Sequence, residues 1–373
     1  IRASGQASLV GVSVQNRTGP PIPLGFHADY GCRLDMPGGL FTLESCRMEL
    51  EPALATNAEP ALIEAGGTWP ISTGGDAQGQ IKLSIRRVNM APFLRLMPQL
   101  RNEALPPIPL EANETLRTLP GGGFRLEGQV QLGLPPMEEQ GSALTMTLRN
   151  EAEKLGDRLE SLILEMGTRR GSEPVDQVRF EGNGRITPPI DLQFQGRIAS
   201  LRLDPYAAWA RAFRAGDGPT PAHEPKSGEA SGRKTPEPTR PSTPAVMDAT
   251  LDIGRLTYRT LELTEAQGQV RMENGNLVGT LDKGSLNGGT ITLNVTYEGQ
   301  RLQPRFAWDA RLEEIPVTPL LRAAHDQWGG KASGRLTANS RGTGEGTGAR
   351  LRQTLQSDTD FVVLEGRLQE LFL

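Results

Sequence analysis

The chain has 373 residues, 36% of them hydrophobic and 5% aromatic, with 44 glycines and 29 prolines, so its composition favours turns over dense cores. Its formal net charge of −4, with acids and bases interspersed, excludes the basic surface of a nucleic-acid-binding protein. No run approaches the roughly 20 apolar residues of a membrane-spanning helix, and the chain does not open with a signal-peptide pattern.

Residues 1–100 are predicted to form a β-meander unit that ends in a short helix. Apolar and polar residues alternate in segments 8–14, 62–69 and 80–86, which is typical of strands with one apolar face. Residues 88–97, with Pro92 and apolar residues at helical spacing, predict the short helix.

Cys32 and Cys46 are the only cysteines of the chain. A hairpin loop centred on Gly39 is expected to place Cys32 opposite Cys46, which permits a disulfide in an oxidising compartment. Two buried free thiols are the alternative, and the sequence leaves both open.

Residues 101–215 are predicted to form a second β-meander unit, again ending in a short helix. Asp204 is expected to cap this helix and Pro205 to occupy its first position. Residues 150–166 fit either a helical face or a strand. Residues 216–245, rich in Pro, Ser, Thr, Gly and charge, are predicted to be a disordered linker or loop.

Residues 246–327 contain the clearest meander, with alternating strands and tight turns. Asn274-Gly275 and Gly288-Gly289 supply the positive φ that hairpin turns need. Thr318 is expected to cap the closing helix. Residues 328–373 are interpreted as a partial, truncated further unit, and both chain ends as cuts in a longer protein.

A long repeat is suggested by three similar junctions between strand and helix. They are centred on Pro92, Pro205 and Pro319, which are 113 and 114 residues apart. Near-equal spacing is typical of repeated units, each here a set of meandering strands closed by one helix.

The sequence shows no constellation that predicts catalysis, a metal site or a cofactor. The three histidines are isolated, and the cysteines form no Cys-x-x-Cys pair. Residues 344–349 read G-x-G-x-x-A but lack the βαβ context of a dinucleotide loop. No nucleophile elbow is present and nothing marks a pair of catalytic carboxylates. We therefore predict a protein that is not an enzyme, with no cofactor and no metal.

The alternating strands each have an apolar face, and other groups must shield these faces from water. Each apolar side chain contributes roughly 1.5 to 3 kcal/mol when it is fully buried, and three or four short helices are too few to cover roughly 18 strands. A second sheet, a sheet curled on itself or a nonprotein ligand must cover the apolar faces.

The region from residue 246 to residue 368 resembles the C-terminal region of AsmA-family proteins. The resemblance is carried by glycine and strand patterns at residues 251–258, 261–264, 272–277, 286–291, 317–321 and 361–368. It implies a mainly β fold, an elongated and curled antiparallel sheet or β-groove built from repeated meanders. It also implies a periplasmic protein of Gram-negative-type bacteria, anchored in the inner membrane through a segment outside this chain.

The implied function is binding or conducting phospholipid acyl chains along the groove between the inner and outer membranes, in support of outer-membrane biogenesis. The implied partners are phospholipid or another acyl lipid, the membrane and envelope proteins, but no nucleic acid. The residues expected to line the groove are Leu251, Ile253, Leu263, Met272, Ile291, Leu293, Val295, Phe306 and Trp308.

Two other hypotheses remain from the sequence. A closed β-sandwich or barrel could act as a scaffold for a protein or glycan partner, with its apolar faces buried against each other. The third hypothesis is an enzyme acting on an envelope polysaccharide.

Overall fold

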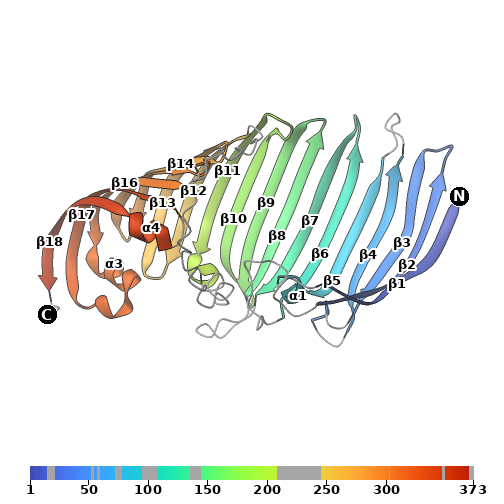
Figure 1. Ribbon diagram of the computed structural model, residues 1–373, viewed down its shortest axis with the longest axis horizontal. Coiled ribbons are helices and arrows are strands. Elements are labelled where there is room, and N and C mark those ends of the chain that lie inside the picture. Colours follow the sequence, from blue (N-terminus) through green and yellow to red (C-terminus); the bar gives the residue numbers. More distant parts are fainter. Residues whose placement is uncertain are drawn as a thin grey trace, which may run out of the picture.

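The computed structural model describes residues 1–14, 22–51, 54–56, 59–71, 78–94, 107–134, 144–207, 245–301, 303–346 and 349–368. Its 18 strands form one sheet (Figure 1). The strands are β1 (Arg2–Val14), β2 (Ile22–Asp35), β3 (Leu40–Leu50), β4 (Ala61–Pro70), β5 (Gln80–Asn89), β6 (Pro109–Leu119), β7 (Gly123–Leu134), β8 (Leu144–Leu155), β9 (Arg158–Arg170), β10 (Glu173–Arg185), β11 (Ile190–Arg202), β12 (Ala245–Tyr258), β13 (Leu261–Glu273), β14 (Asn276–Leu286), β15 (Gly289–Glu298), β16 (Arg305–Pro316), β17 (Ala332–Glu345) and β18 (Gln356–Leu368).

Each strand pairs with its neighbours in chain order, so the sheet is a long meander. All of these pairs are antiparallel except β11 with β12, which are parallel. Parallel neighbours need a connection that returns to the starting end of the sheet. The connection between these two strands begins with the described residues 203–207, and the rest of it, residues 208–244, lies outside the described residues, as does nearly all of the predicted linker 216–245.

Asparagine and glycine form the tight turns of the C-terminal meander. Asn274 and Gly275 have φ of 51° and 82°, and Asn287 and Gly288 have φ of 50° and 86°. Positive φ at both central residues is what a type I′ hairpin turn requires. The first turn is as predicted, whereas the second begins one residue earlier than Gly288-Gly289, because Gly289 already starts β15.

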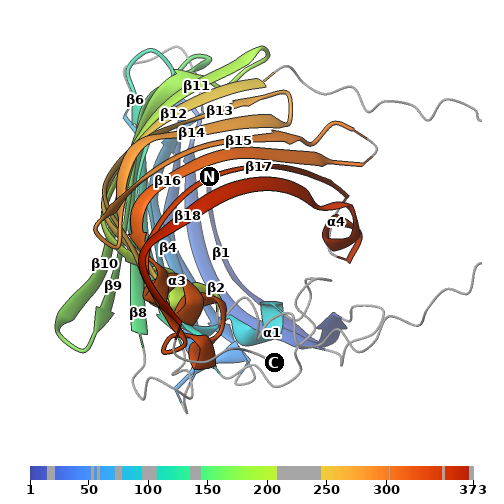
Figure 2. The same ribbon diagram turned by 90° about the vertical axis from the view of Figure 1, so that its left-hand side faces the viewer.

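The sheet curls into an open trough (Figure 2). Non-glycine residues with positive φ, namely Arg87, Glu265, Glu314 and Glu365, lie inside strands, and the register of strand pairs shifts near all four. Such β-bulges bend a strand and increase its twist. The result is an elongated, curled β-groove that is not closed into a barrel. The predicted fold class is therefore confirmed, and the closed sandwich or barrel is wrong for this sheet.

Three short helical segments lie along one rim of the trough. They are α1 (Ala91–Leu94), residues 203–207 and α3 (Val317–Ala324), which follow β5, β11 and β16. The short helix α4 (Ala349–Thr354) follows β17 at the opposite rim (Figure 2). The 3₁₀ turn η2 (Asp326–Trp328) follows α3. All strands belong to one sheet, and the division into units 1–100, 101–215, 246–327 and 328–373 stays a prediction.

Two predicted helix caps are wrong. The hydroxyl of Thr318 lies inside α3 and donates to the carbonyl of Ala332 at 3.1 Å. Asp204 lies inside the helical segment 203–207, and its carboxylate accepts the backbone N–H of Arg259 at 2.8 Å. Both side chains form hydrogen bonds from a rim helix to the end of a neighbouring strand instead of capping the helix to which they belong.

The ambiguous segment 150–166 is extended. It contains the turn between β8 and β9, with Gly156 at φ 59°. The expected pairing of the two cysteines is also wrong. Cys32 pairs with Leu43, and Cys46 pairs with Tyr30, because the register of β2 and β3 shifts after Gly31. Both cysteines are free in the structure.

Candidate functional site: the inner face of the sheet

A single row of paired residues crosses all 18 strands on one face of the sheet. Directly paired residues point to the same face, so this central row can be followed through the register from β1 to β18. It consists of Gly5, Tyr30, Cys46, Ala65, Leu83, Glu114, Gly128, Asn150, Leu164, Phe180, Gly196, Leu251, Gly268, Leu281, Leu293, Ala310, Ser340 and Thr359. Glu114 is its only acidic or basic residue.

Two flanking rows on the same face contain no charged residue. One follows the register from β1 to β13 through Ala7, Ala28, Met48, Ile63, Ile85, Ala112, Val130, Leu148, Met166, Val178, Ile198, Ile253 and Ala266. The other crosses from β1 to β18 through Ala3, Cys32, Leu43, Gly67, Ile81, Leu116, Leu126, Ala152, Leu162, Gly182, Phe194, Ala249, Val270, Gly279, Val295, Trp308, Gly342 and Ser357. Together the three rows form a mainly apolar band, which is three rows wide from β1 to β13 and two rows wide from β14 to β18, and which Glu114 and Asn150 interrupt in the central row.

Aromatic rings lie over glycines of neighbouring strands within this band. A Cβ at Gly182 would be 2.4 Å from the ring of Phe194, and one at Gly342 would be 2.1 Å from the ring of Trp308. The missing side chains therefore leave the space that the two rings occupy over the neighbouring strands.

All nine residues predicted to line the groove lie on this face. Leu251, Ile253, Leu293, Val295 and Trp308 belong to the three rows. The others join them through the pairs Met272 with Met247, Phe306 with Tyr297 and Ile291 with Gly284, and through the contact of Leu263 with the Cβ position of Gly284. Ile253 is buried at 7% exposure, and the other eight are half-buried.

The rim helices identify the apolar face as the inner face of the curl. Ala91 of α1 packs with Leu132, which is two residues along β7 from Val130 of a flanking row. Leu351 of α4 lies 2.7 Å from the Cβ position of Gly344, which pairs with Phe306. Figure 2 shows α1 and α4 on the inside of the curl.

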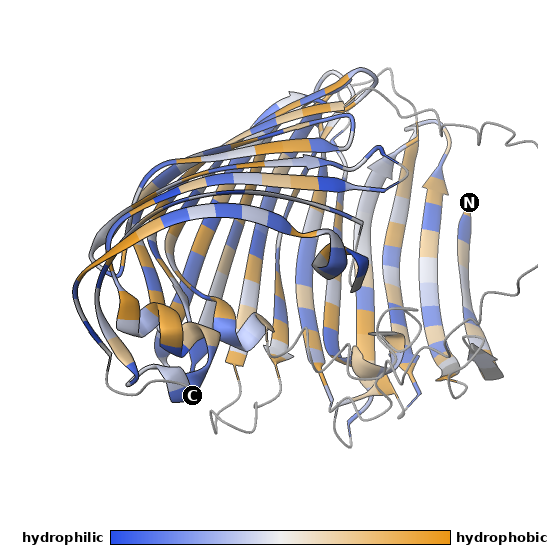
Figure 3. Ribbon diagram, turned by 60° about the vertical axis from the view of Figure 1, so that its left-hand side comes forward, coloured by the Kyte–Doolittle hydropathy of each residue, from blue (hydrophilic) through white to orange (hydrophobic). Residues whose placement is uncertain are grey.

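The outer face is polar along an equivalent row. From β1 to β14 the paired residues are Gln6, Asp29, Arg47, Glu64, Ser84, Asn113, Gln129, Arg149, Glu165, Arg179, Arg197, Asp252, Gln267 and Lys283. The alternation of hydrophobic and hydrophilic residues along the strands is visible as bands in Figure 3.

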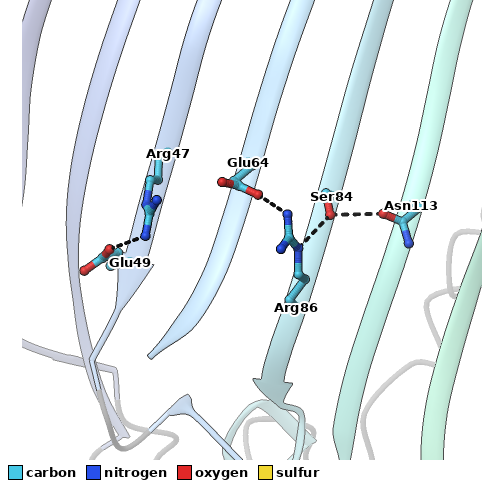
Figure 4. Close-up of polar contacts among 6 residues, drawn as sticks. All are labelled: Arg47, Glu49, Glu64, Ser84, Arg86 and Asn113. Carbon is cyan, nitrogen blue, oxygen red and sulfur yellow. Dashed lines mark hydrogen bonds and ion pairs between the residues drawn. The ribbon is translucent and has the colours of Figure 1, made fainter. Parts of the chain in front are cut away.

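Hydrogen bonds and ion pairs connect the outer row. Arg86 pairs with Glu64 and approaches Ser84, whose hydroxyl donates to Asn113 at 3.0 Å (Figure 4). Arg179 lies between Glu165 and Glu181, and its hydrogen bond to Glu181 is the main cause that raises the pKa of its guanidinium. Open hollows on this face are lined by side chains that already pair with each other, such as Arg149, Glu165 and Arg179.

The inner face carries one fully satisfied buried carboxylate, near the rim. Asp176 is 0% exposed and accepts hydrogen bonds from the Thr168 hydroxyl at 2.5 Å, the Arg202 N–H at 2.7 Å and the Tyr206 hydroxyl at 2.9 Å. Burial, followed by the charge of Asp176, raises the pKa of Tyr206, so its hydroxyl stays a donor. This cluster attaches the helical segment 203–207 to the sheet.

Glu114 and Asn150 form a second polar pair on the inner face, in the middle of the central row. The Asn150 side-chain amide donates to Glu114 Oε2 at 3.1 Å across Gly128. The sequence analysis missed this pair because strand β6 was not predicted. The period of two through Leu110, Ala112 and Leu116 was the signal that could have placed Glu114 on the apolar face.

Other candidate chemistry is not assembled by the described residues. Among them, no group of three or more His, Cys, Asp or Glu side chains could hold a metal ion. In the same part of the chain, no helix has the length and apolarity of a membrane-crossing segment. His325 stacks on Trp328, with 5.4 Å between the ring centroids, and His223 lies outside the described residues.

Comparison with protein-family models, with curated proteins and with solved structures finds no match for this chain. The functional interpretation therefore depends on the geometry of the trough and on the chemistry of its two faces.

Proposed function

We propose that this protein binds the acyl chains of lipids along the inner face of its curled sheet. The observation that carries the proposal is the apolar band, two to three rows wide, in which Glu114 is the only acidic or basic residue. A hydrocarbon chain needs a continuous surface of this kind, because it gains free energy from contact with apolar area at roughly 25 cal/mol per Å².

The apolar inner face is only partly covered by other protein elements, which favours an apolar ligand. The band is half-buried at most positions, and the helices of the described residues lie only at the rims. Within the described ranges no second sheet packs on it, since all of their strands belong to one sheet. Acyl chains would supply the missing cover, while the ion-paired outer face meets water.

The resemblance to AsmA-family proteins extends the proposal to the place and purpose of binding. On this hypothesis the trough conducts phospholipid between the inner and outer membranes of a bacterial envelope and supports outer-membrane biogenesis. Among the described strands, β1 and β18 each have one neighbour, and the band runs from one of them to the other across the whole sheet, which suits a path for acyl chains along it.

Lipid extraction and mass spectrometry of the natively purified protein test the proposal. We expect copurifying lipid from the wild-type protein, and about a tenfold loss in a Leu293→Asp variant, because the new carboxylate would be desolvated under an acyl chain. Leu293 lies in the central row and pairs with Leu281 and Ala310.

Thr292→Asp is the matched control for this experiment. Thr292 is the preceding residue of β15, points to the outer face and pairs with Arg311. The control variant should keep its lipid. A folded Leu293→Asp variant that retains lipid at the wild-type level would contradict the proposal, as would a wild-type protein that carries none.

A further inference from the structure

Glu114 is the exception in an otherwise uncharged band, and its position is central. It lies on β6 between Leu83 and Gly128 in the central row. Its carboxylate leans over Gly128, where an added Cβ would be 2.2 Å from Glu114 Oε2. The glycine leaves the room that the carboxylate needs to reach Asn150 on the next strand.

The hydrogen bonding of this pair is incomplete. A carboxylate has about four acceptor positions, and the structure gives the Glu114 carboxylate one donor, the Asn150 amide at 3.1 Å. The Asn150 Oδ1 atom is buried and has no hydrogen-bond partner among the described residues. The pair therefore has acceptor positions to spare and no positively charged donor.

A comparison with Asp176 shows what a complete arrangement on the same face looks like. Three donors from Thr168, Arg202 and Tyr206 satisfy that carboxylate. No equivalent donors surround Glu114, because the three rows contain no Lys, Arg or His. Lys154, the charged residue whose ammonium lies over the Phe124 ring at 5.4 Å, is four residues from Asn150, about 13 Å along β8.

When a ligand binds, the lack of donors around the Glu114 carboxylate becomes energetically unfavourable. In the empty trough, water can solvate the Glu114 carboxylate. When hydrocarbon covers the central row, that water is lost, and an ionised carboxylate without a partner is strongly unfavourable in an apolar environment. The described residues supply no cation within the band, so we infer that the compensating donor arrives with the ligand.

We propose that Glu114 and Asn150 bind the protonated amine of an amphiphile whose hydrocarbon chain lies along the central row. This proposal rests on the proposed function and names the head-group chemistry that the trough selects. An ammonium group offers three donors and a positive charge, which match the Glu114 carboxylate and the spare acceptor of Asn150.

Two probes of equal chain length test the inference: dodecylamine and dodecanol, each titrated below the concentration at which it aggregates or separates from water. Wild-type protein should bind the amine about tenfold more tightly than the alcohol, the effect of one charge-assisted hydrogen bond. Glu114→Gln keeps the shape and an acceptor for Asn150 but removes the charge, so we expect this preference to fall below about twofold.

Glu111→Gln is the matched control, since Glu111 is an exposed residue of the same strand that pairs with Gln131 on the outer face. It should keep the wild-type preference. Equal wild-type binding of both probes, or an equal loss in both variants, would overturn the amine site while leaving acyl binding intact. Binding of neither probe would overturn acyl binding, and the amine site with it.

Discussion

The two faces of this sheet are built from the same strands, yet they differ sharply in polarity and charge. The inner face has a band in which charge is confined to Glu114, while the outer row from Gln6 to Lys283 contains no apolar residue. In a two-layered protein, the apolar face would be covered by other protein elements. Here the cover that the described residues provide is confined to the rims, so the two faces of the sheet differ strongly in polarity without a second layer from this part of the chain.

The two faces also differ in what their polar groups contribute. Ion pairs on the outer face are solvent-exposed, and such pairs contribute about 0 to 1 kcal/mol each. Polar groups on the inner face are few and shielded, so each one matters more. Substitutions of neighbouring residues, one on each face, should therefore change the free energy of unfolding by different amounts.

The largest effect is expected for Asp176→Ala. The substitution leaves the Thr168 hydroxyl, the Arg202 N–H and the Tyr206 hydroxyl without their shared acceptor. We expect a loss of about 3 kcal/mol in the free energy of unfolding, measured by urea denaturation. The neighbouring Gln177→Ala, on the exposed outer face, should change it by less than about 0.5 kcal/mol. Equal losses in both variants would contradict the assignment of the two faces.

An intermediate effect is expected for Gly196→Val in the central row. A Cβ at Gly196 would be 2.7 Å from the Phe180 ring and 2.6 Å from Leu251, so the ring must leave its place. Overpacking of this kind costs about 1 to 3 kcal/mol. The adjacent Gln195→Val, pointing outward, should be close to neutral by thermal unfolding. A Gly196→Val protein as stable as the wild type would show that the packing of the Phe180 ring does not require glycine at this position.

The smallest effect is expected for Arg179→Gln on the outer face. The variant loses its ion pairs with Glu165 and Glu181 but leaves all three groups in water. We expect a change smaller than that of Gly196→Val, and one that shrinks further as salt is added, because exposed charges are screened. A loss as large as that of Asp176→Ala, insensitive to salt, would mean that the outer row is a buried network.

Much of the fold could be predicted because its signals are local. Period-two alternation predicted strands, and Asn274-Gly275 predicted a turn, since both depend only on neighbouring residues. The cysteine pairing failed for the opposite reason. A bulge after Gly31 shifts the register of β2 and β3, and no local sequence pattern predicted this bulge.

The candidate site divides in the same way. The nine predicted groove residues share one face because alternation decides which side of a strand a residue occupies. Glu114 and Asn150 were missed because they are distant in sequence and meet only through the register of β6, β7 and β8.

The sequence by itself therefore determined that each strand has an apolar and a polar side, and where several of the turns fall. Only the tertiary structure decided that 18 such strands align their apolar sides into one band, that bulges curl this band into an open trough, and that one carboxylate interrupts it. The physical reason is that side-chain direction follows from the backbone of each strand, whereas register and curvature are properties of strand pairs.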